Sequence, residues 1–247
     1  MIDNQNAIEV ENLTKVFHVL HRERSVKGAA LKWLRFRLPR REEFVALHDI
    51  SFSVPRGQTV GVVGRNGSGK STLLSLLSRI YRPTAGRITV QGRIATLLEL
   101  GAGFHPEFTG VENVFLNGVI LGISHAELEN RLPSIMEFAE ITEFRDTPVK
   151  HYSMGMTARL GFSVAVHAQP DVLLVDEVLA VGDGPFQEKC YAKIEEFKAQ
   201  GVTIFFVSHD MRAIQRVSDR VLWIDNHIIR ADGPAAEVIR DYENLER

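Results

Sequence analysis

A glycine-rich segment has the residue types needed to hold a polyphosphate. Residues 64–71 read Gly-Arg-Asn-Gly-Ser-Gly-Lys-Ser and fit the pattern G-x-x-x-x-G-K-[ST] in full. An apolar strand is predicted before the segment, over 58–63, and a helix after it, over 70–80. The glycines permit positive φ angles, so successive backbone N–H groups can point at one anion near the positive end of the helix dipole. The predicted phosphate-binding residues are Gly64, Asn66, Gly67, Ser68, Gly69, Lys70, Ser71 and Thr72.

Two carboxylates follow a second apolar strand, over 172–177 (Val-Leu-Leu-Val-Asp-Glu). They emerge at its carboxyl end, which is where open α/β sheets carry their ligand sites. Such a run is also common as a plain strand end, but the phosphate loop upstream favours phosphoryl transfer. Asp176 and Ser71 are then expected to hold Mg²⁺, Lys70 to reach the β and γ phosphates, and Glu177 to orient or deprotonate the attacking water.

His209 follows a third predicted strand, over 202–207. A lone histidine at such a place is more often a structural cap. Like the two carboxylates, however, His209 stands just past a predicted buried strand. A histidine there can donate a hydrogen bond to a terminal phosphate. Glu177 and His209 are therefore the predicted catalytic residues.

The elements that position these residues predict an α/β fold. Apolar strands alternate with helices, which is typical of a parallel sheet covered on both faces. Strands predicted over 7–13 and 44–54 add an antiparallel part, so the core is expected to be a mixed sheet. The region of about 110–168 contains helices and no predicted strand, which indicates an inserted helical subdomain. Residues 1–247 are expected to form a single domain that ends in a helix over 234–247, with Pro234 at its first position.

Composition excludes several classes of protein. Hydrophobic residues make up 45% and charged residues 24%, so the chain is not disordered. The net charge of −2 argues against a nucleic-acid partner. No run approaches the roughly 20 apolar residues of a membrane-spanning helix, and the polar first residues lack the apolar core of a signal peptide. A single cysteine, Cys190, rules out an intrachain disulfide and a thiolate zinc cluster.

Residues 21–43 differ in composition from the rest of the chain. They hold eight basic and three acidic residues, a local charge of +5, interleaved with Trp33, Leu34, Phe36 and Leu38. This pattern is predicted to be a basic amphipathic insertion at a membrane surface. A plain solvated loop is an alternative.

With these motifs in place, residues 151–156 (His-Tyr-Ser-Met-Gly-Met) give the chain a family resemblance. It resembles the ATPase subunit of an ATP-binding cassette (ABC) transporter, whose Leu-Ser-Gly-Gly-Gln signature stands at this place. The resemblance implies the P-loop NTPase fold of ABC nucleotide-binding domains, with ATP and Mg²⁺ bound. It also implies a homodimer with ATP at the interface, in which Ser153 and Gly155 contact the partner's ATP and Asp183 belongs to the loop that crosses the interface.

The resemblance narrows to one branch of the family. The Tyr-Ser-x-Gly-Met form, residues 98–104 (Leu-Glu-Leu-Gly-Ala-Gly-Phe) and residues 176–183 (Asp-Glu-Val-Leu-Ala-Val-Gly-Asp) are similar to polysaccharide and teichoic-acid exporters, most of all Wzt-type O-antigen exporters. The implied function is ATP hydrolysis that powers export of a lipid-linked polysaccharide across the bacterial inner membrane. A separate transmembrane permease would be the partner, and the chain would lie peripherally on the cytoplasmic face. By the same resemblance, residues 21–43 would lie near the inner leaflet, and pairing of their arginines with the pyrophosphate of a lipid-linked sugar is the alternative. A capsule or teichoic-acid exporter is the nearest alternative; a soluble nucleic-acid or ribosome factor and a non-catalytic regulator are less favoured.

Three further expectations rest on the resemblance. Phe17, by its place after the first strand, is expected to stack on adenine, although a core position is the alternative. Glu99 is the nearest candidate for the glutamine with which the family senses Mg²⁺. No C-terminal carbohydrate-binding domain, as carried by some relatives, is expected after the final helix.

Overall fold

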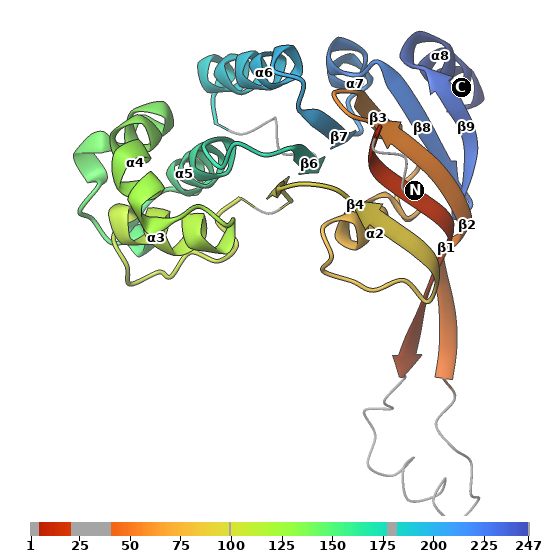
Figure 1. The fold of residues 1–247 in the computed structure, drawn as a ribbon, viewed down its shortest axis with the longest axis horizontal. Helices are drawn as coiled ribbons and strands as arrows, with labels where there is room; N and C mark the ends of the chain where they lie inside the picture. Colours follow the sequence, from red (N-terminus) through yellow and green to blue (C-terminus); the bar gives the residue numbers. More distant parts are fainter. Residues whose placement is uncertain (1–4, 21–40, 99, 177–181, 247) are drawn as a thin grey trace, which may run out of the picture.

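Two β-sheets enclose one helix, other helices lie on the outer face of the larger sheet, and a group of helices forms one end of the molecule (Figure 1). The computed structural model describes residues 5–20, 41–98, 100–176 and 182–246. The larger sheet consists, in spatial order, of β5 (Ile94–Leu97), β6 (Val172–Asp176), β7 (Thr203–Val207), β3 (Thr59–Val63), β8 (Arg220–Asp225) and β9 (Ile228–Pro234). All neighbours in it are parallel except β8 and β9. The carboxyl ends of β3, β6 and β7 therefore share one edge.

The smaller sheet is antiparallel and has the order β2 (Arg41–Pro55), β1 (Asn6–Leu20), β4 (Ala85–Val90). The pairing of β4 with β1 ends at Thr14, whereas the pairing of β1 with β2 continues to Leu20 and Arg41. Beyond Thr14, the described strands β1 and β2 thus form a two-stranded ribbon that projects from the body of the molecule (Figure 1).

The helices of the described residues divide between the two faces of the larger sheet. They are α2 (Lys70–Leu77), α3 (Gly110–Ile120), α4 (His125–Ala139), α5 (Met154–Val166), α6 (Gly184–Ala199), α7 (Met211–Val217) and α8 (Ala235–Glu246), with 3-10 turns at Thr142–Phe144 and Val149–His151. Successive side chains of a strand point to opposite faces of the sheet, so each buried strand contributes to the hydrophobic cores on both faces. On β6, Val172 and Leu174 belong to the core that surrounds α2, and Leu173 and Val175 to the core under the other helices.

Helices α3, α4 and α5 pack on one another at one end of the molecule (Figure 1). Thr109 and Ser124 begin α3 and α4 with reciprocal capping boxes, which satisfy two terminal N–H groups each. The Tyr152 hydroxyl donates to the Phe144 carbonyl at 2.7 Å, and an added Cβ at Gly110 would lie 2.2 Å from that hydroxyl. The start of α3 can therefore approach the start of α5 only because residue 110 is glycine.

The element boundaries differ from the sequence predictions at several places. β1 extends beyond the predicted 7–13, and β2 begins at Arg41 rather than residue 44, because the two strands pair as far as Leu20 and Arg41. Residues 41–43 accordingly belong to a strand and not to the basic insertion, the rest of which lies outside the described residues. Pro234 is the last residue of β9, paired with Arg220, so the final helix begins one residue later than predicted. Helix α2 ends at Leu77 rather than at the predicted residue 80.

Candidate functional site

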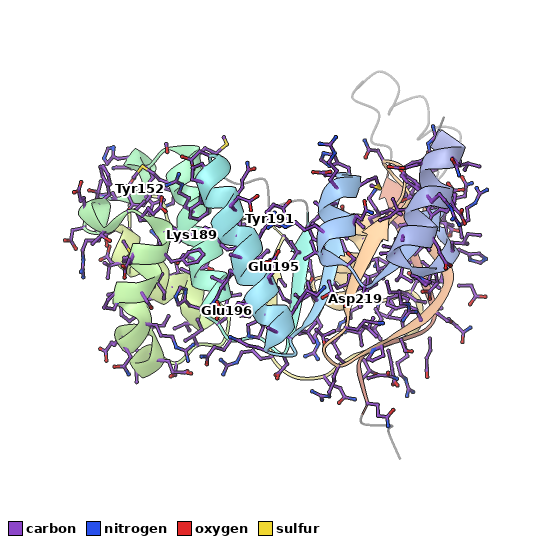
Figure 2. All side chains as sticks on the ribbon, turned by 90° about the horizontal axis from the view of Figure 1, so that it is seen from above. Tyr152, Lys189, Tyr191, Glu195, Glu196 and Asp219 are labelled. Atoms are coloured by element: carbon purple, nitrogen blue, oxygen red, sulfur yellow. The ribbon has the colours of Figure 1, made fainter. Side chains whose placement is uncertain are left out.

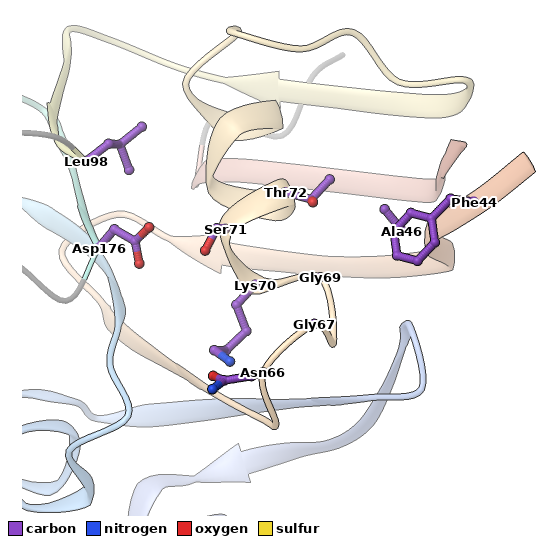
Figure 3. Close-up of a pocket in the computed structure, with 10 residues that line it drawn as sticks. All are labelled: Phe44, Ala46, Asn66, Gly67, Gly69, Lys70, Ser71, Thr72, Leu98 and Asp176. Atoms are coloured by element: carbon purple, nitrogen blue, oxygen red, sulfur yellow. The ribbon is translucent and has the colours of Figure 1, made fainter. Parts of the chain in front are cut away.

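A cavity of about 490 Å³ opens at the carboxyl edge of the larger sheet (Figure 3). It is lined by Phe44, Ala46, Asn66, Gly67, Gly69, Lys70, Ser71, Thr72, Leu98 and Asp176. Six of these lining residues were predicted to hold phosphates, and two, Asp176 and Ser71 (also one of the six), to hold a metal ion. Parallel strands, together with the helix that follows β3, thus bring together side chains that lie more than 100 positions apart in the chain.

The loop between β3 and α2 has the backbone of an anion cradle. Gly64 has a φ of 150° and Gly69 a φ of 111°. An added Cβ would lie 2.1 Å from the Ile224 carbonyl oxygen at Gly64 and 2.4 Å from the Ala46 carbonyl oxygen at Gly69. At Gly67, with a φ of 82°, an added Cβ would meet no atom within 4 Å. Gly64 lets the loop pack against β8, and Gly69 lets it pack against β2. Gly67 borders open space in the cavity.

Polar groups inside the loop fit a phosphate. The Lys70 side chain is 7% exposed, and its Nζ donates to the carbonyls of Gly64 at 2.6 Å and Arg65 at 3.0 Å. The Ser68 hydroxyl is buried and has no hydrogen-bond partner among the described residues. A buried hydroxyl without a partner is costly, and a phosphate oxygen in the cradle would satisfy it. The loop therefore carries both the charge and the donors that a terminal phosphate needs.

Ser71 and Asp176 point toward the same space in the cavity (Figure 3). A hydroxyl and a carboxylate are oxygen ligands of the kind Mg²⁺ prefers, and Mg²⁺ commonly takes its other ligands from water and substrate phosphates. Among the described residues, no group of three or more His, Cys, Asp and Glu side chains could hold a metal by itself. The donor set thus fits Mg²⁺ bound together with a nucleotide. Glu99 and Glu177, predicted to act beside these two residues, lie outside the described residues.

His209 lies at the same edge of the sheet as the cradle. It follows β7, which stands between β6 and β3 in the sheet, and its side chain is exposed. The next residue, Asp210, caps α7 by accepting a hydrogen bond from the Arg212 N–H at 2.9 Å. Asp210, and not His209, thus supplies the cap of α7. His209 is not among the residues that line the cavity.

The aromatic side chain in the cavity wall is Phe44 and not Phe17. Phe17 packs edge-on against Tyr81, with ring centroids 5.3 Å apart, and lies outside the cavity lining. Phe44 is 49% exposed, lines the cavity and contacts the His227 ring edge-on at 5.7 Å. The two phenylalanines are paired in the β1–β2 ladder, so the residue in the cavity wall is the cross-strand neighbour of Phe17. Stacking of Phe17 on adenine stays a prediction.

Ser153, Gly155 and Asp183 lie away from the cavity lining. Ser153 is the N-cap of α5, and its Oγ accepts a hydrogen bond from the Met156 N–H at 3.2 Å. An added Cβ at Gly155 would meet only the Ser153 Oγ, at 3.8 Å, so the start of α5 is open. In Figure 1, α5 lies on the opposite side of β6 from α2. The structure therefore presents this helix terminus as a second potential anion site, separate from the cradle of the same chain.

No helix of the described residues has both the length and the apolar character needed to cross a membrane.

Comparison with known proteins places these motifs in one family. Residues 47–180, more than half of the chain, match the family model described as "ABC transporter". The chain is 48% identical to the O-antigen export system ATP-binding protein RfbB of Klebsiella pneumoniae, over 96% of this chain and 97% of that protein. It is 45% identical to an RfbB of Myxococcus xanthus and 44% identical to the teichoic acids export ATP-binding protein TagH of Shouchella clausii, and it spans only 56% and 62% of those proteins.

Solved structures share the fold. An ATP-binding subunit of an ABC transporter aligns with a TM-score of 0.76 at 22% identity, over 96% of this chain and 93% of that chain. A dimeric ATP-binding cassette with bound ADP and Pi aligns with a TM-score of 0.73 at 19% identity, over 92% and 98%. The predicted P-loop NTPase fold and the resemblance to polysaccharide and teichoic-acid exporters are confirmed. The chain belongs to the ABC transporter family, as an ATP-binding subunit with ATPase activity.

Proposed function

We propose that this chain powers the export of a lipid-linked polysaccharide, of the O-antigen type, across the bacterial inner membrane. The observation that carries the proposal is the cavity in which the glycine-rich cradle, Lys70, Ser71 and Asp176 meet. The similarity to RfbB proteins at 45–49% identity supports the O-antigen class of cargo. Similarity to TagH proteins at 39–44% identity makes a teichoic acid the second candidate, and a capsule polymer is the third.

Within the cavity, Ser71 and Asp176 would hold Mg²⁺. When bound, the ion neutralises charge on the β and γ phosphates. Lys70 would exchange its bonds to the Gly64 and Arg65 carbonyls for phosphate oxygens, because its Nζ already lies within the loop. Glu99 stays a prediction for a further role near the metal ion.

For hydrolysis, Glu177 would orient the attacking water from the position directly after Asp176. His209, at the carboxyl end of the neighbouring strand β7, would donate a hydrogen bond to the γ-phosphate. Both residues would act at the sheet edge that carries the cradle. Phosphoryl transfer needs this kind of positioning and charge neutralisation more than covalent chemistry.

A head-to-tail homodimer would give the start of α5 a ligand. Because the Ser153 Oγ accepts a hydrogen bond from the Met156 N–H, its hydroxyl hydrogen stays available to donate to an anion. The γ-phosphate of ATP held by the partner's cradle is the proposed anion, with the open backbone at Gly155 allowing close approach. Asp183, exposed at the start of α6, would lie at the same interface.

Export also needs a permease, since the described residues contain no spanning helix. The proposed partner is a separate transmembrane subunit, which would place this chain peripherally on the cytoplasmic face of the inner membrane. The basic segment at 21–43 is proposed to lie near the inner leaflet, where its +5 charge would favour anionic lipid or the cargo's pyrophosphate.

The assigned water-orienting role is tested by Glu177→Gln. This variant should bind ATP with wild-type affinity but turn over more slowly by about 100-fold or more, the scale expected for loss of a general base. Glu137→Gln, an exposed substitution on α4, is the matched control and should keep wild-type turnover. Wild-type turnover in Glu177→Gln would refute the assignment.

The cargo is tested by deleting the gene and restoring it with the wild-type or the Glu177→Gln version. Loss of surface O-antigen with accumulation of its lipid-linked precursor, restored only by the wild-type gene, is the expected result. Loss of a teichoic acid or capsule instead would select an alternative cargo. Unchanged surface polymers would refute the proposal.

A further inference from the structure

Arg159 connects the signature helix α5 to the loop that precedes α6. Its Nη2 donates to the Asp183 Oδ1 at 2.7 Å, and its Nη1 donates to the Glu140 Oε2 at 2.9 Å. The guanidinium also lies over the ring of Phe186, 4.8 Å from the centroid. One side chain thus joins the end of α4, the first part of α5 and the first residues of α6.

The contacts continue as a series of ion pairs of alternating charge. Glu140 ends α4 with a φ of 58°, and its other oxygen accepts a hydrogen bond from the Lys189 Nζ at 3.2 Å. Lys189 belongs to α6 and also donates to the Phe138 carbonyl at 2.8 Å; Figure 2 shows it on the side of α6 that faces α4 and α5. The series Asp183–Arg159–Glu140–Lys189 therefore ends on α6, the helix that Asp183 begins.

The same Asp183 oxygen that binds Arg159 also caps α6. Asp183 Oδ1 accepts a hydrogen bond from the Phe186 N–H at 3.4 Å, and Phe186 itself is buried. An added Cβ at Gly182, which has a φ of 77°, would lie 3.3 Å from the Arg159 Nε and 3.2 Å from Phe186. The backbone just before Asp183 consequently follows the guanidinium closely, so the position of Arg159 sets the position of this turn.

We propose that Arg159 is a positioning residue that fixes Asp183 relative to Ser153, so that both meet the partner subunit's nucleotide together. The inference rests on the proposed dimer, in which Ser153 and Asp183 lie at one interface. Arg159 is six positions after Ser153 on α5 and is only 19% exposed, whereas Asp183 is 63% exposed. A planar guanidinium with two donors directed at two carboxylates holds such a geometry better than an ammonium.

This role differs from a contribution to stability. Asp183 and Glu140 are 63% and 48% exposed, and ion pairs of such exposed groups add little to the folding free energy. Loss of Arg159 should therefore change how two copies close on ATP much more than it changes unfolding.

The experiment compares Arg159→Gln, Asp183→Asn and the double variant, all in the Glu177→Gln background and again in the wild-type background. Asparagine is as good an N-cap as aspartate, so Asp183→Asn removes the charge and keeps the cap.

Each single variant should weaken ATP-dependent dimerisation and lower kcat by about tenfold or more, since misplacing an active-site group by 1 Å can lower the rate about 100-fold. The ATP Kd of the monomer and the thermal midpoint should stay close to those of the parent protein. The double variant should be no worse than either single variant, because both remove one interaction.

Two control variants separate positioning from general ion pairing. Arg216→Gln removes an arginine that bridges Glu188 and Glu195 between α6 and α7, at 3.1 and 3.3 Å. Glu195 and Tyr191, beside that arginine, lie on the side of α6 that faces α7 (Figure 2). Glu140→Gln removes one of the two carboxylates that bind Arg159 but keeps the bond between Arg159 and Asp183, so it should weaken dimerisation less than Arg159→Gln does. Arg216→Gln should dimerise like its parent protein.

Three results would overturn the inference alone: normal dimerisation in Arg159→Gln, effects of the single variants that multiply in the double variant, or an equal loss in Arg216→Gln. Absence of an ATP-dependent dimer in the Glu177→Gln parent would overturn the proposed dimer, and this inference with it.

Discussion

Phe17 and Phe44 are direct cross-strand partners, yet only Phe44 lines the cavity beside the phosphate cradle. Phe17 packs on Tyr81, and the Lys15 Nζ lies over its ring at 4.8 Å. Phe44 instead presents a half-exposed ring to the cavity that Gly67 and Thr72 also line, and packs edge-on against the His227 ring. Of this pair, Phe44 has the exposure that stacking on a nucleobase requires.

Phe44→Ala is therefore expected to weaken ATP binding. Aromatic stacking contributes about 0.5–1.5 kcal/mol beyond area burial, which corresponds to an increase in Kd of about two- to tenfold. Titration of a fluorescent ATP analogue measures the effect. Phe17→Ala is the matched control and should leave Kd within about twofold; the opposite order of effects would restore Phe17 as the stacking residue.

Gly64 and Gly67 should respond very differently to alanine. Gly64→Ala puts a Cβ 2.1 Å from the Ile224 carbonyl oxygen, so it should destabilise the fold by about 2 kcal/mol or more and abolish ATP binding. Gly67→Ala meets no atom within 4 Å, so only its positive φ costs free energy, about 1 kcal/mol. Urea unfolding of both variants checks the order, and equal losses would contradict the described cradle.

His167 should make the folding stability depend on pH below about 6.5. Burial lowers the pKa of His167, whose Nδ1 lies 2.7 Å from the Ser163 carbonyl oxygen. Because the folded-state pKa is below the unfolded value of 6.5, the unfolded chain binds the proton more readily, and stability is lost as pH falls through that range. Urea unfolding from pH 7.5 to 5 should show a steeper loss in the wild type than in His167→Gln. The exposed His125 serves as a control: His125→Gln should follow the wild-type curve.

Cys190 should be unreactive in the folded protein. Burial raises the pKa of its thiol to about 12, and its side chain is fully buried. Iodoacetamide at pH 8 should label the native chain slowly and the urea-unfolded chain rapidly, and the single cysteine makes the added mass unambiguous. The raised pKa also means that stability is retained below pH 9 and lost as pH rises from about 9 toward 12. Rapid labelling of native protein would contradict this burial.

The local patterns were the predictable part of the fold and the site. The phosphate loop combines glycine spacing, an apolar strand and a helix within about 20 residues, and all three are present around Lys70. The strand before Asp176 was predicted because four apolar residues in a row, followed by charged ones, are typical of a buried strand. Helices α4 and α6 carry a local signal of the same kind, since their capping residues, Ser124 and Asp183, stand directly before them.

Long-range pairing accounts for what the sequence did not predict. The alternation in β1 breaks where Asn12 has a φ of 47° and the register with β2 shifts between Val10 and Leu13, so the predicted strand stopped at Leu13. The continuation to Leu20 depends on a partner strand more than 20 residues away. The same ladder places Phe44 in the cavity wall, and no local pattern around Phe44 signals that position.

The ribbon formed by β1 and β2 beyond Thr14 has a mechanical consequence. It carries Phe44 at the cavity and has no third strand among the described residues, and two strands by themselves are only marginally stable. A force on its outer end that displaced Phe44 would change the shape of the cavity. By reciprocity, if such a displacement weakens ATP binding, bound ATP opposes the displacement with the same coupling free energy.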